Sequence, residues 1–315
     1  MRLATLHEGT PDGRLVLVSR DGTRFVDAPV ATLQAALERW SEVEADLAAR
    51  DAEAGAPLAG MRLAAPLPRA WQWLDASAFP SHGALMQRAF GLPPIETALP
   101  LMYQGLSDRF LGPADDVPLP SEDHGIDFEG EFGVVTDAVP MGTDAAAAMA
   151  HIRLVVLIND WSLRVLAPAE MKTGFGFIQA KPACSMAPIA VTPDELGPAW
   201  LDGRVCLPLH VALNGEAFGH PDGAAMAFGF HELVAHAART RALPAGTIIG
   251  SGTVSNDDHA HVGSTCIAER RGAEIVAHGE PRTEFLRFGD RVTMAARLPG
   301  GETPFGVIDQ QVVAG

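Results

Sequence analysis

The segment from Ile126 to Val135 places acidic residues inside a run that otherwise has the character of a core strand. Side chains alternate between the two faces of a strand, so Asp127, Glu129 and Glu131 would share one face and the phenylalanines the other. Neighbouring carboxylates repel each other and resist burial unless a cation or a proton lies between them. The segment is therefore either an edge strand with a solvated acidic face or a buried site for a cation. The flanking Phe and Val residues favour burial.

The charge of the chain limits its partners. The 315 residues include 23 Lys and Arg against 39 Asp and Glu, a formal net charge of −16. So acidic a chain is a poor partner for nucleic acid or an anionic membrane, and we expect neither. The three cysteines, Cys184, Cys206 and Cys266, are widely spaced, which is typical of a protein of the reducing cytosol without a disulfide framework. The first residues read as a strand rather than a signal peptide, so we expect a cytoplasmic protein.

Sequence patterns divide the chain into two regions. Residues 1–68 predict a small N-terminal domain, with a hairpin around Asp21-Gly22 and a helix that Thr32 caps and that reaches about Glu53. Residues 69–315 predict a larger domain of short strands broken by Gly and Pro, with occasional helices. The predicted fold class is α+β and mostly β, without alternating βαβ units.

Several elements of the larger domain have their own signals. Asn214-Gly215 between two apolar runs predicts a hairpin, and Thr143 is the expected cap of an Ala-rich helix that reaches about His151. The remaining expected elements are a buried strand over Arg153–Asn159, a helix over Phe230–Thr240, and strands over Gly246–Ser255, Ala273–His278 and Arg291–Leu298.

Further motifs could supply partners for the acidic strand. Asp75 and His82 lie seven residues apart, and Asp160 ends the expected buried strand. Each has an ordinary alternative: Asp160 could be a helix N-cap, and Arg164 and Lys181 could be surface charges.

Taken together, the motifs resemble those of the fumarylacetoacetate hydrolase family. The resemblance covers about residues 69–315, and its pieces occur in the family's order. They are Asp75-x6-His82, Asp127-Phe128-Glu129-Gly130-Glu131, Asn159-Asp160-Trp161-Ser162-x-Arg164, Lys181 in Gln-Ala-Lys-Pro, and Ser251-Gly252-Thr253-Val254-Ser255. The resemblance implies a fumarylacetoacetase-like β-roll catalytic domain, with a small N-terminal domain of strands and a helix.

The resemblance also implies a metal site. Family members hold a divalent ion with four carboxylates, and the matching positions are Asp75, Glu129, Glu131 and Asp160. An all-oxygen set of ligands suits Mg²⁺ or Ca²⁺ and is poor for zinc. Four carboxylates overcompensate such an ion, so we expect Arg164 and Lys181 to stand nearby, the second helping to stabilise an oxyanion.

A general base is implied as well. His82 matches the family's base, and the ordinary pKa of a histidine lets it take a proton from water near neutral pH. Glu269 is the expected counterpart of the glutamate that orients this base. Tyr103, Thr253 and Arg88 are expected to contact the substrate.

The function that the resemblance implies is metal-dependent hydrolysis of a C–C bond. The expected substrate is a small fumarylacetoacetate- or acylpyruvate-like dioxo acid, in aromatic amino-acid or aromatic-compound breakdown, and the expected assembly is a homodimer. A decarboxylase, hydratase or isomerase of related oxo acids is the alternative within the family. A catalytically silent binding protein on the same fold is the alternative from another class.

Overall fold

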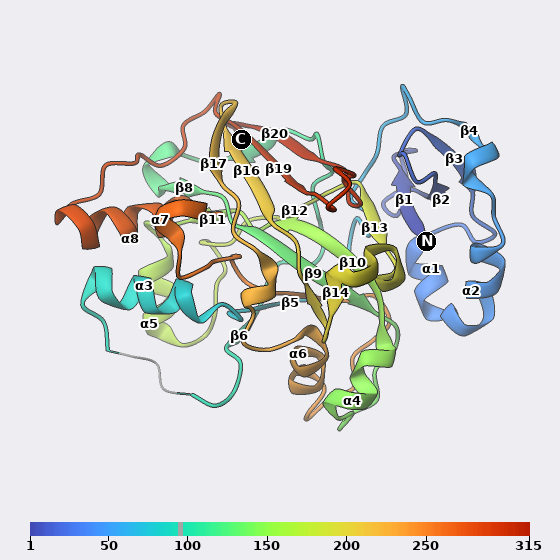
Figure 1. Ribbon diagram of the computed structural model, residues 1–315, viewed down its shortest axis with the longest axis horizontal. Helices are drawn as coiled ribbons and strands as arrows, with labels where there is room; N and C mark the ends of the chain where they lie inside the picture. Colours follow the sequence, from blue (N-terminus) through green and yellow to red (C-terminus); the bar gives the residue numbers. More distant parts are fainter. Residues whose placement is uncertain (94–96) are drawn as a thin grey trace.

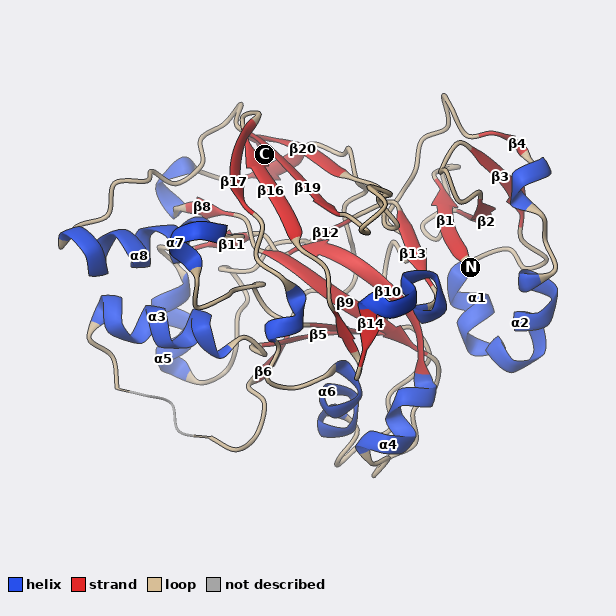
Figure 2. Cartoon of the chain, viewed as in Figure 1, coloured by secondary structure: helices blue, strands red, loops and turns tan. Residues whose placement is uncertain are grey.

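Strands dominate the computed structural model, which describes residues 1–93 and 97–315 (Figures 1 and 2). An 11-stranded sheet runs through the molecule, with helices around it. Its spatial order is β4 (Ala56–Pro57), β3 (Arg24–Asp27), β2 (Arg14–Val18), β1 (Arg2–Leu6), β13 (Ile189–Val191), β10 (Ile152–Asn159), β9 (Gly130–Thr136), β18 (Thr247–Gly250), β5 (Gln72–Ala76) and β6 (Met102–Gln104), with β12 (Ser185–Met186) beside β10. This architecture confirms the predicted class, α+β and mostly β.

A second sheet has five strands. In spatial order they are β17 (Glu216–Gly219), β16 (Leu209–Leu213), β19 (Arg291–Ala296), β20 (Ile308–Ala314) and β7 (Val117–Leu119). Asn214 and Gly215 join β16 to β17 with φ angles of 52° and 83°, the positive values that a tight two-residue hairpin needs, so the expected hairpin is confirmed. Two short pairs complete the strands: β8 (Ile126–Asp127) with β11 (Ser162–Leu163), and β14 (Trp200–Leu201) with β15 (Arg204–Val205).

The helices are short. The α-helices are α1 (Leu33–Glu38), α2 (Trp40–Ala48), α3 (Pro80–Phe90), α4 (Ala145–Ala148), α5 (Ala167–Thr173), α6 (Phe230–Ala237), α7 (His259–Val262) and α8 (Ile267–His278). The 3₁₀ turns are η1 (Ala52–Ala54), η2 (Glu122–His124), η3 (Met149–His151), η4 (Pro193–Ala199) and η5 (Gly223–Ala225). None of the described helices is long and apolar enough to cross a membrane.

Three helix predictions need adjustment at their ends. The helix expected over Phe230–Thr240 is α6, which stops at Ala237. Thr32 caps α1 as expected, accepting a hydrogen bond from the amide of Ala35. The predicted single helix is nevertheless two, because Arg39 leaves the helical region at φ −132°, and α2 ends at Ala48. The Ala-rich helix α4 begins after Asp144, whose carboxylate caps it, and not at Thr143.

The strand predicted over Ala273–His278 is wrong, because these residues form the second half of α8. Local apolar pairs such as Ile275-Val276 suggested a strand, but the segment continues a helix that packs on α3. A Cβ added to Gly272 would lie 2.4 Å from the methyl carbon of Met86 on α3, so the two helices are in close contact. The strand expected over Gly246–Ser255 stops at Gly250, where the chain leaves the sheet.

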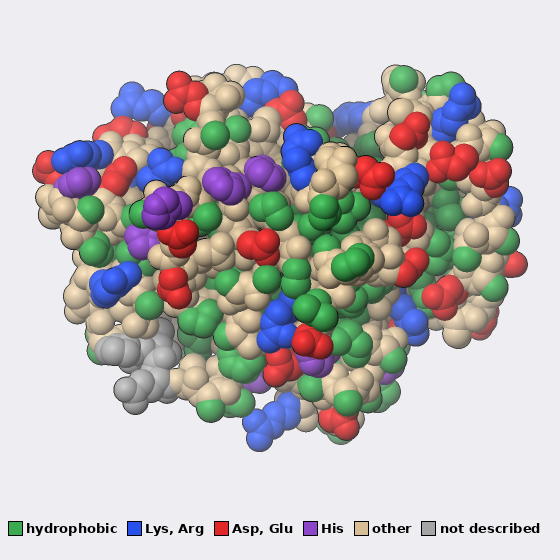
Figure 3. Space-filling model, viewed as in Figure 1, with side chains coloured by type: hydrophobic (Ala, Val, Ile, Leu, Met, Phe, Trp, Pro, Cys, Tyr) green, Lys and Arg blue, Asp and Glu red, His purple; other side chains and the backbone are tan. Residues whose placement is uncertain are grey.

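The N-terminal strands are part of the large sheet. They lie at one side of the molecule, and β1 pairs antiparallel with β13, with Arg2 opposite Val191 (Figure 1). One apolar cluster contains Leu3 and Leu37 from this region together with Trp73 and Ile158 from the remainder. Sheet and core therefore both cross residue 68, and the domain boundary there stays a prediction. On the face drawn in Figure 3, acidic and basic side chains are interspersed.

Candidate metal centre and catalytic site

Three predicted ligands meet where strands of the large sheet end. Asp75 lies on β5, Glu131 on β9, and Asp160 directly follows β10. The sheet brings them together, because Glu131 is paired with Ile158 of β10 and Asp75 with Gly250 of β18, which lies beside β9. One oxygen from each of the three carboxylates lies within 4.8 Å of the others, and all three side chains are buried.

Gly250 allows this close approach. A Cβ at this position would lie 2.7 Å from Oδ1 of Asp75, 2.9 Å from Oε2 of Glu131 and 2.3 Å from the ring of Trp73. Such contacts are shorter than real Cβ atoms make, so a side chain here would push the carboxylates apart. The glycine of the Ile249-Gly250-Ser251 stretch was not singled out from the sequence, because only the sheet register places it between two acids.

The cluster carries more negative charge than the protein compensates. Both oxygens of Glu131 are buried and lack a hydrogen-bond partner among the described residues. Burial and the charges of Asp75 and Asp160 raise the pKa of Glu131 well above its usual value. Burial first, then the charge of Asp160, raises the pKa of Asp75 to about 8, against a smaller opposing effect of Lys181. A site of this kind needs a proton or a cation, and its oxygen-only ligands fit a hard divalent ion.

Glu129 lies beside this cluster and is held by protein cations and hydroxyls. Its Oε1 is 2.8 Å from the nitrogen of both Lys181 and Arg164 and accepts a hydrogen bond from the hydroxyl of Ser162 at 2.7 Å. Its Oε2 accepts one from the hydroxyl of Thr253 at 2.5 Å. Burial disfavours the carboxylate, but the charges of Arg164 and Lys181 outweigh it and lower the pKa of Glu129. The structure thus brings three predicted ligands together and places the fourth in an adjoining, cation-bound position.

Asp160 is surrounded by donors. The ammonium of Lys181 contacts its Oδ2, which also accepts from the hydroxyl of Tyr103 at 2.8 Å, and the thiol of Cys184 is 2.9 Å from Oδ1. Lys181 also lies 5.6 Å from the centroid of the Tyr103 ring. Burial and the charge of Asp160 raise the pKa of Tyr103, so its hydroxyl stays a donor. Residues after Asp160 enter β11, so the alternative reading of Asp160 as a helix N-cap is wrong.

Asp127 has a structural role that the sequence did not reveal. Its buried carboxylate accepts hydrogen bonds from the amides of Ile267 and Ala268, at 2.7 and 2.9 Å, in the first turn of α8. It also forms an ion pair with Nε of Arg164 at 2.7 Å. The antiparallel pair of β8 and β11 places Arg164 there. Asp127 and Arg164 therefore tie the start of α8 to Glu129.

His82 and Glu269 face each other across the contact between α3 and α8. Nδ1 of His82 is 3.6 Å from Oε1 of Glu269, whose side chain is buried. Glu269 accepts a hydrogen bond from Ser255, which in turn accepts one from Ser81 at 2.8 Å. The glutamate lies in the first turn of α8. Its position beside His82 is nevertheless the one the sequence predicted.

The loop after β18 connects the acidic cluster to this pair. The amide of Gly252 donates to Asp75 at 3.1 Å, Thr253 donates to Glu129, and Ser255 donates to Glu269. One short segment thus fixes groups on both sides of the site. The motif Ser251-Gly252-Thr253-Val254-Ser255 therefore supplies hydrogen-bond donors to the acidic residues of the site.

Arg88 is not brought to the site by any described contact. It is exposed on α3, and six helical residues turn it by about 240° from His82, onto another face.

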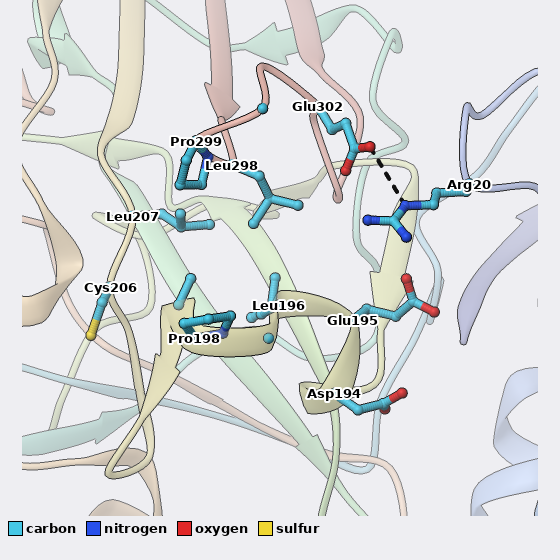
Figure 4. Close-up of a pocket in the computed structure, with 13 residues that line it drawn as sticks. Arg20, Asp194, Glu195, Leu196, Pro198, Cys206, Leu207, Leu298, Pro299 and Glu302 are labelled. Atoms are coloured by element: carbon cyan, nitrogen blue, oxygen red, sulfur yellow. Dashed lines mark ion pairs between the residues drawn. The ribbon is translucent and has the colours of Figure 1, made fainter.

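A cavity of about 610 Å³ lies elsewhere, lined by none of the residues of the acidic cluster and by neither His82 nor Glu269 (Figure 4). It is bordered by η4, by the segment from Leu298 to Glu302 and by Arg20. An ion pair of 3.5 Å joins Arg20 to Glu302 at its edge.

Family models match nearly the whole chain. "Fumarylacetoacetate (FAA) hydrolase C-terminal" covers residues 72–313, and "Fumarylacetoacetase N-terminal domain 2" covers residues 1–69. Among curated proteins, the chain is 29% identical over 164 residues to 2,4-didehydro-3-deoxy-L-rhamnonate hydrolase of Sphingomonas sp. (strain SKA58), covering 51% of this chain and 54% of that protein. It is 28% identical over 198 residues to fumarylacetoacetase of Caenorhabditis elegans, covering 54% and 47%. The aligned part thus spans about half the length of these relatives.

Solved structures share the fold over the full chain. Maleylpyruvate hydrolase from Sphingobium sp. SYK-6, in complex with manganese(II) and pyruvate, superposes with a TM-score of 0.69 at 17% identity, covering 100% of both chains. The 5-carboxymethyl-2-hydroxymuconate delta-isomerase from Mycobacterium smegmatis superposes with a TM-score of 0.65 at 20% identity, covering 100% of this chain and 99% of that one. Family members are hydrolases and isomerases. With its two matched models and its shared fold, the chain belongs to the fumarylacetoacetate hydrolase family.

Proposed function

We propose that this protein is a divalent-metal-dependent hydrolase that cleaves a C–C bond in a fumarylacetoacetate- or acylpyruvate-like dioxo acid. The observation that carries the proposal is the buried cluster of Asp75, Glu131 and Asp160. One oxygen of each lies within 4.8 Å of the others, and both oxygens of Glu131 lack a hydrogen-bond partner among the described residues. Both curated relatives and the manganese-bound neighbour are named as hydrolases, fumarylacetoacetase among them.

The residues present fit a hard ion such as Mg²⁺, Ca²⁺ or Mn²⁺. Asp75, Glu131 and Asp160 would hold it, with Glu129 beside them. When bound, the ion would polarise substrate oxygens and lower the energy of a leaving enolate. Lys181 is buried between Glu129 and Asp160 and keeps its charge, so it can stabilise negative charge that develops on a substrate oxygen.

His82 would supply the base. If its Nδ1 carries a proton toward Glu269, Nε2 retains the lone pair that accepts a proton from water. The water oxygen then forms a bond to a carbonyl carbon, the adjacent C–C bond breaks, and His82 returns its proton to the carbon that leaves. Water is consumed, and a carboxylic acid and a ketonic product result.

The test is a panel of β-diketo and acylpyruvate acids assayed with and without a chelator. We expect loss of the substrate's absorbance that the chelator abolishes and added Mg²⁺ or Mn²⁺ restores. An isomerase would change the spectrum without forming two products, and a silent binding protein would leave every substrate intact. Either result would contradict the proposal.

Two variants separate the ion from the base. His82→Ala should lower turnover by about 100-fold or more while sparing metal affinity, since general-base catalysis contributes about that much. Glu131→Ala should lose both turnover and metal affinity, measured by isothermal titration. Full activity of His82→Ala would make the base assignment wrong.

A further inference from the structure

A second group of metal-ligating side chains lies beside the acidic cluster. One ligand atom each from His82, Cys266 and Glu269 lies within 4.8 Å of the other two. This group offers nitrogen, sulfur and oxygen, whereas the acidic cluster offers oxygen alone. Nitrogen and thiolate ligands are those that Zn²⁺ selects over Mg²⁺ or Ca²⁺.

The separation between His82 and Glu269 suits a tetrahedral ion. Two ligands that each bind zinc at about 2.0–2.1 Å stand roughly 3.4 Å apart in a tetrahedron. Nδ1 of His82 is 3.6 Å from Oε1 of Glu269, close to that separation and too long for a hydrogen bond. Small rotations of the side chains would be enough to admit an ion.

The polar atoms of this group are unusually short of partners. Nδ1 of His82 and Oε2 of Glu269 are buried and have no hydrogen-bond partner among the described residues. Glu269 is only 1% exposed, and a buried carboxylate oxygen without a partner is costly. His82 is 24% exposed, which gives an ion a route from solvent.

The backbone fixes the sulfur. Cys266 forms an isolated antiparallel bridge with Glu129, and its sulfur caps α8 by accepting from the amide of Glu269 at 3.2 Å. Burial raises the pKa of the Cys266 thiol, so the free thiol is protonated, and binding of an ion would release that proton. The backbone bridge to Glu129 therefore fixes the position of the Cys266 sulfur beside the acidic cluster.

We propose that His82, Cys266 and Glu269 form a second metal site that takes a soft divalent ion of the Zn²⁺ class. The fourth ligand position would belong to water. An ion on Nδ1 moves the ring proton to Nε2, where the lone pair of the base would otherwise be. Zinc would therefore inhibit the enzyme without displacing the hard ion, a consequence that rests on the proposed role of His82.

Cobalt spectroscopy tests the site independently of turnover. With the acidic cluster filled by excess Mg²⁺, Co²⁺ should produce a thiolate-to-cobalt charge-transfer band that saturates at one equivalent. Cys266→Ser should abolish the band, and because serine is a good helix cap, α8 should keep its start, checked by circular dichroism. Glu269→Gln should keep the band but weaken Co²⁺ binding by about tenfold or more.

Cys184→Ser is the matched control. The thiol of Cys184 contacts Asp160 of the acidic cluster, so cobalt bound there could give the same band. The Cys184→Ser variant should keep the band. Absence of a band in the wild-type protein, or a band that survives in Cys266→Ser, would overturn the proposal.

The inhibitory consequence has its own readout. Zn²⁺ in the presence of excess Mg²⁺ should stop wild-type turnover and leave Cys266→Ser at its own zinc-free rate. Equal inhibition of both would show that zinc acts at the acidic cluster and overturn this consequence. Absence of turnover under every condition would contradict the proposed function, while the cobalt band would still report on the site.

Discussion

The individual carboxylates set the response of the metal-free protein to pH. Unfolded Asp75 releases its proton near 3.8, whereas in the folded protein burial and Asp160 raise its pKa to about 8. Between these values the folded state holds more protons than the unfolded state, so the free energy of unfolding falls as pH rises. Chelator-treated protein should therefore melt at progressively lower temperature as the pH is raised from near 3.8 to about 8.

Asp75→Asn is the control for this prediction. The substitution removes the titrating group but leaves an oxygen to accept from the amide of Gly252. Its melting temperature should depend less on pH than that of the wild type. Added Mg²⁺ should stabilise the wild type most at the high end of the range, because the ion competes with protons. A wild-type melting temperature that rises over this range would contradict the assignment.

Among individual residues, the acidic ligands could be predicted from the sequence, whereas the roles of Asp127 and Gly250 could not. The resemblance to the family implied Asp75, Glu131 and Asp160 as ligands, and the structure brings them together. The role of Asp127 could not be predicted, since its partners are amides of a helix 140 and 141 residues away. Gly250 was missed for a related reason, because only the strand register shows that it lies against the carboxylates of Asp75 and Glu131.

Two groups cap the start of helix α8, the sulfur of Cys266 and the buried carboxylate of Asp127. Asp127 accepts from two amides of the first turn and pairs with Arg164. Asp127→Ala should lower the free energy of unfolding by about 1–3 kcal/mol, because two amides of α8 lose their acceptor and the partly buried Arg164 loses one of its two carboxylate partners. Urea denaturation measures the loss. Turnover should fall as well, since α8 carries Glu269.

Asp123→Ala is the matched comparison, because Asp123 is an exposed acid four residues earlier. It should change stability by less than about 0.5 kcal/mol. If Asp127→Ala were as stable as Asp123→Ala, the carboxylate would not hold the helix.

Elements were predicted well where local signals decide them. The Asn214-Gly215 hairpin and the cap at Thr32 follow from backbone preferences within a few residues. The helical state of residues 273–278 was missed, because its apolar pairs fit a strand equally well and only packing on α3 selects the helix. No Gly or Pro marks the break at Arg39, so no local signal predicted it.

At the scale of the whole molecule, the N-terminal region and the remainder of the chain share one sheet and one apolar cluster. We therefore expect one cooperative unfolding transition. Leu37→Ala, in α1, should lower the stability of the entire chain by about 2–5 kcal/mol and shift that single transition. Differential scanning calorimetry with and without Mg²⁺ measures it.

Glu44→Ala, an exposed position on α2, serves as the control and should leave the transition in place. Two separate transitions, one moved by Leu37→Ala and the other by Mg²⁺, would show that the regions unfold independently. That outcome would support a domain boundary near residue 68.

The ammonium of Lys181 lies between Glu129 and Asp160, which has a consequence for how an ion would enter the acidic cluster. The positive charge of Lys181 compensates part of the negative charge of the buried carboxylates, so the protein can fold before a metal ion binds. The ion can then bind after folding, and its identity would depend on which divalent ions are available at that time. A chelator should therefore remove the ion without unfolding the chain.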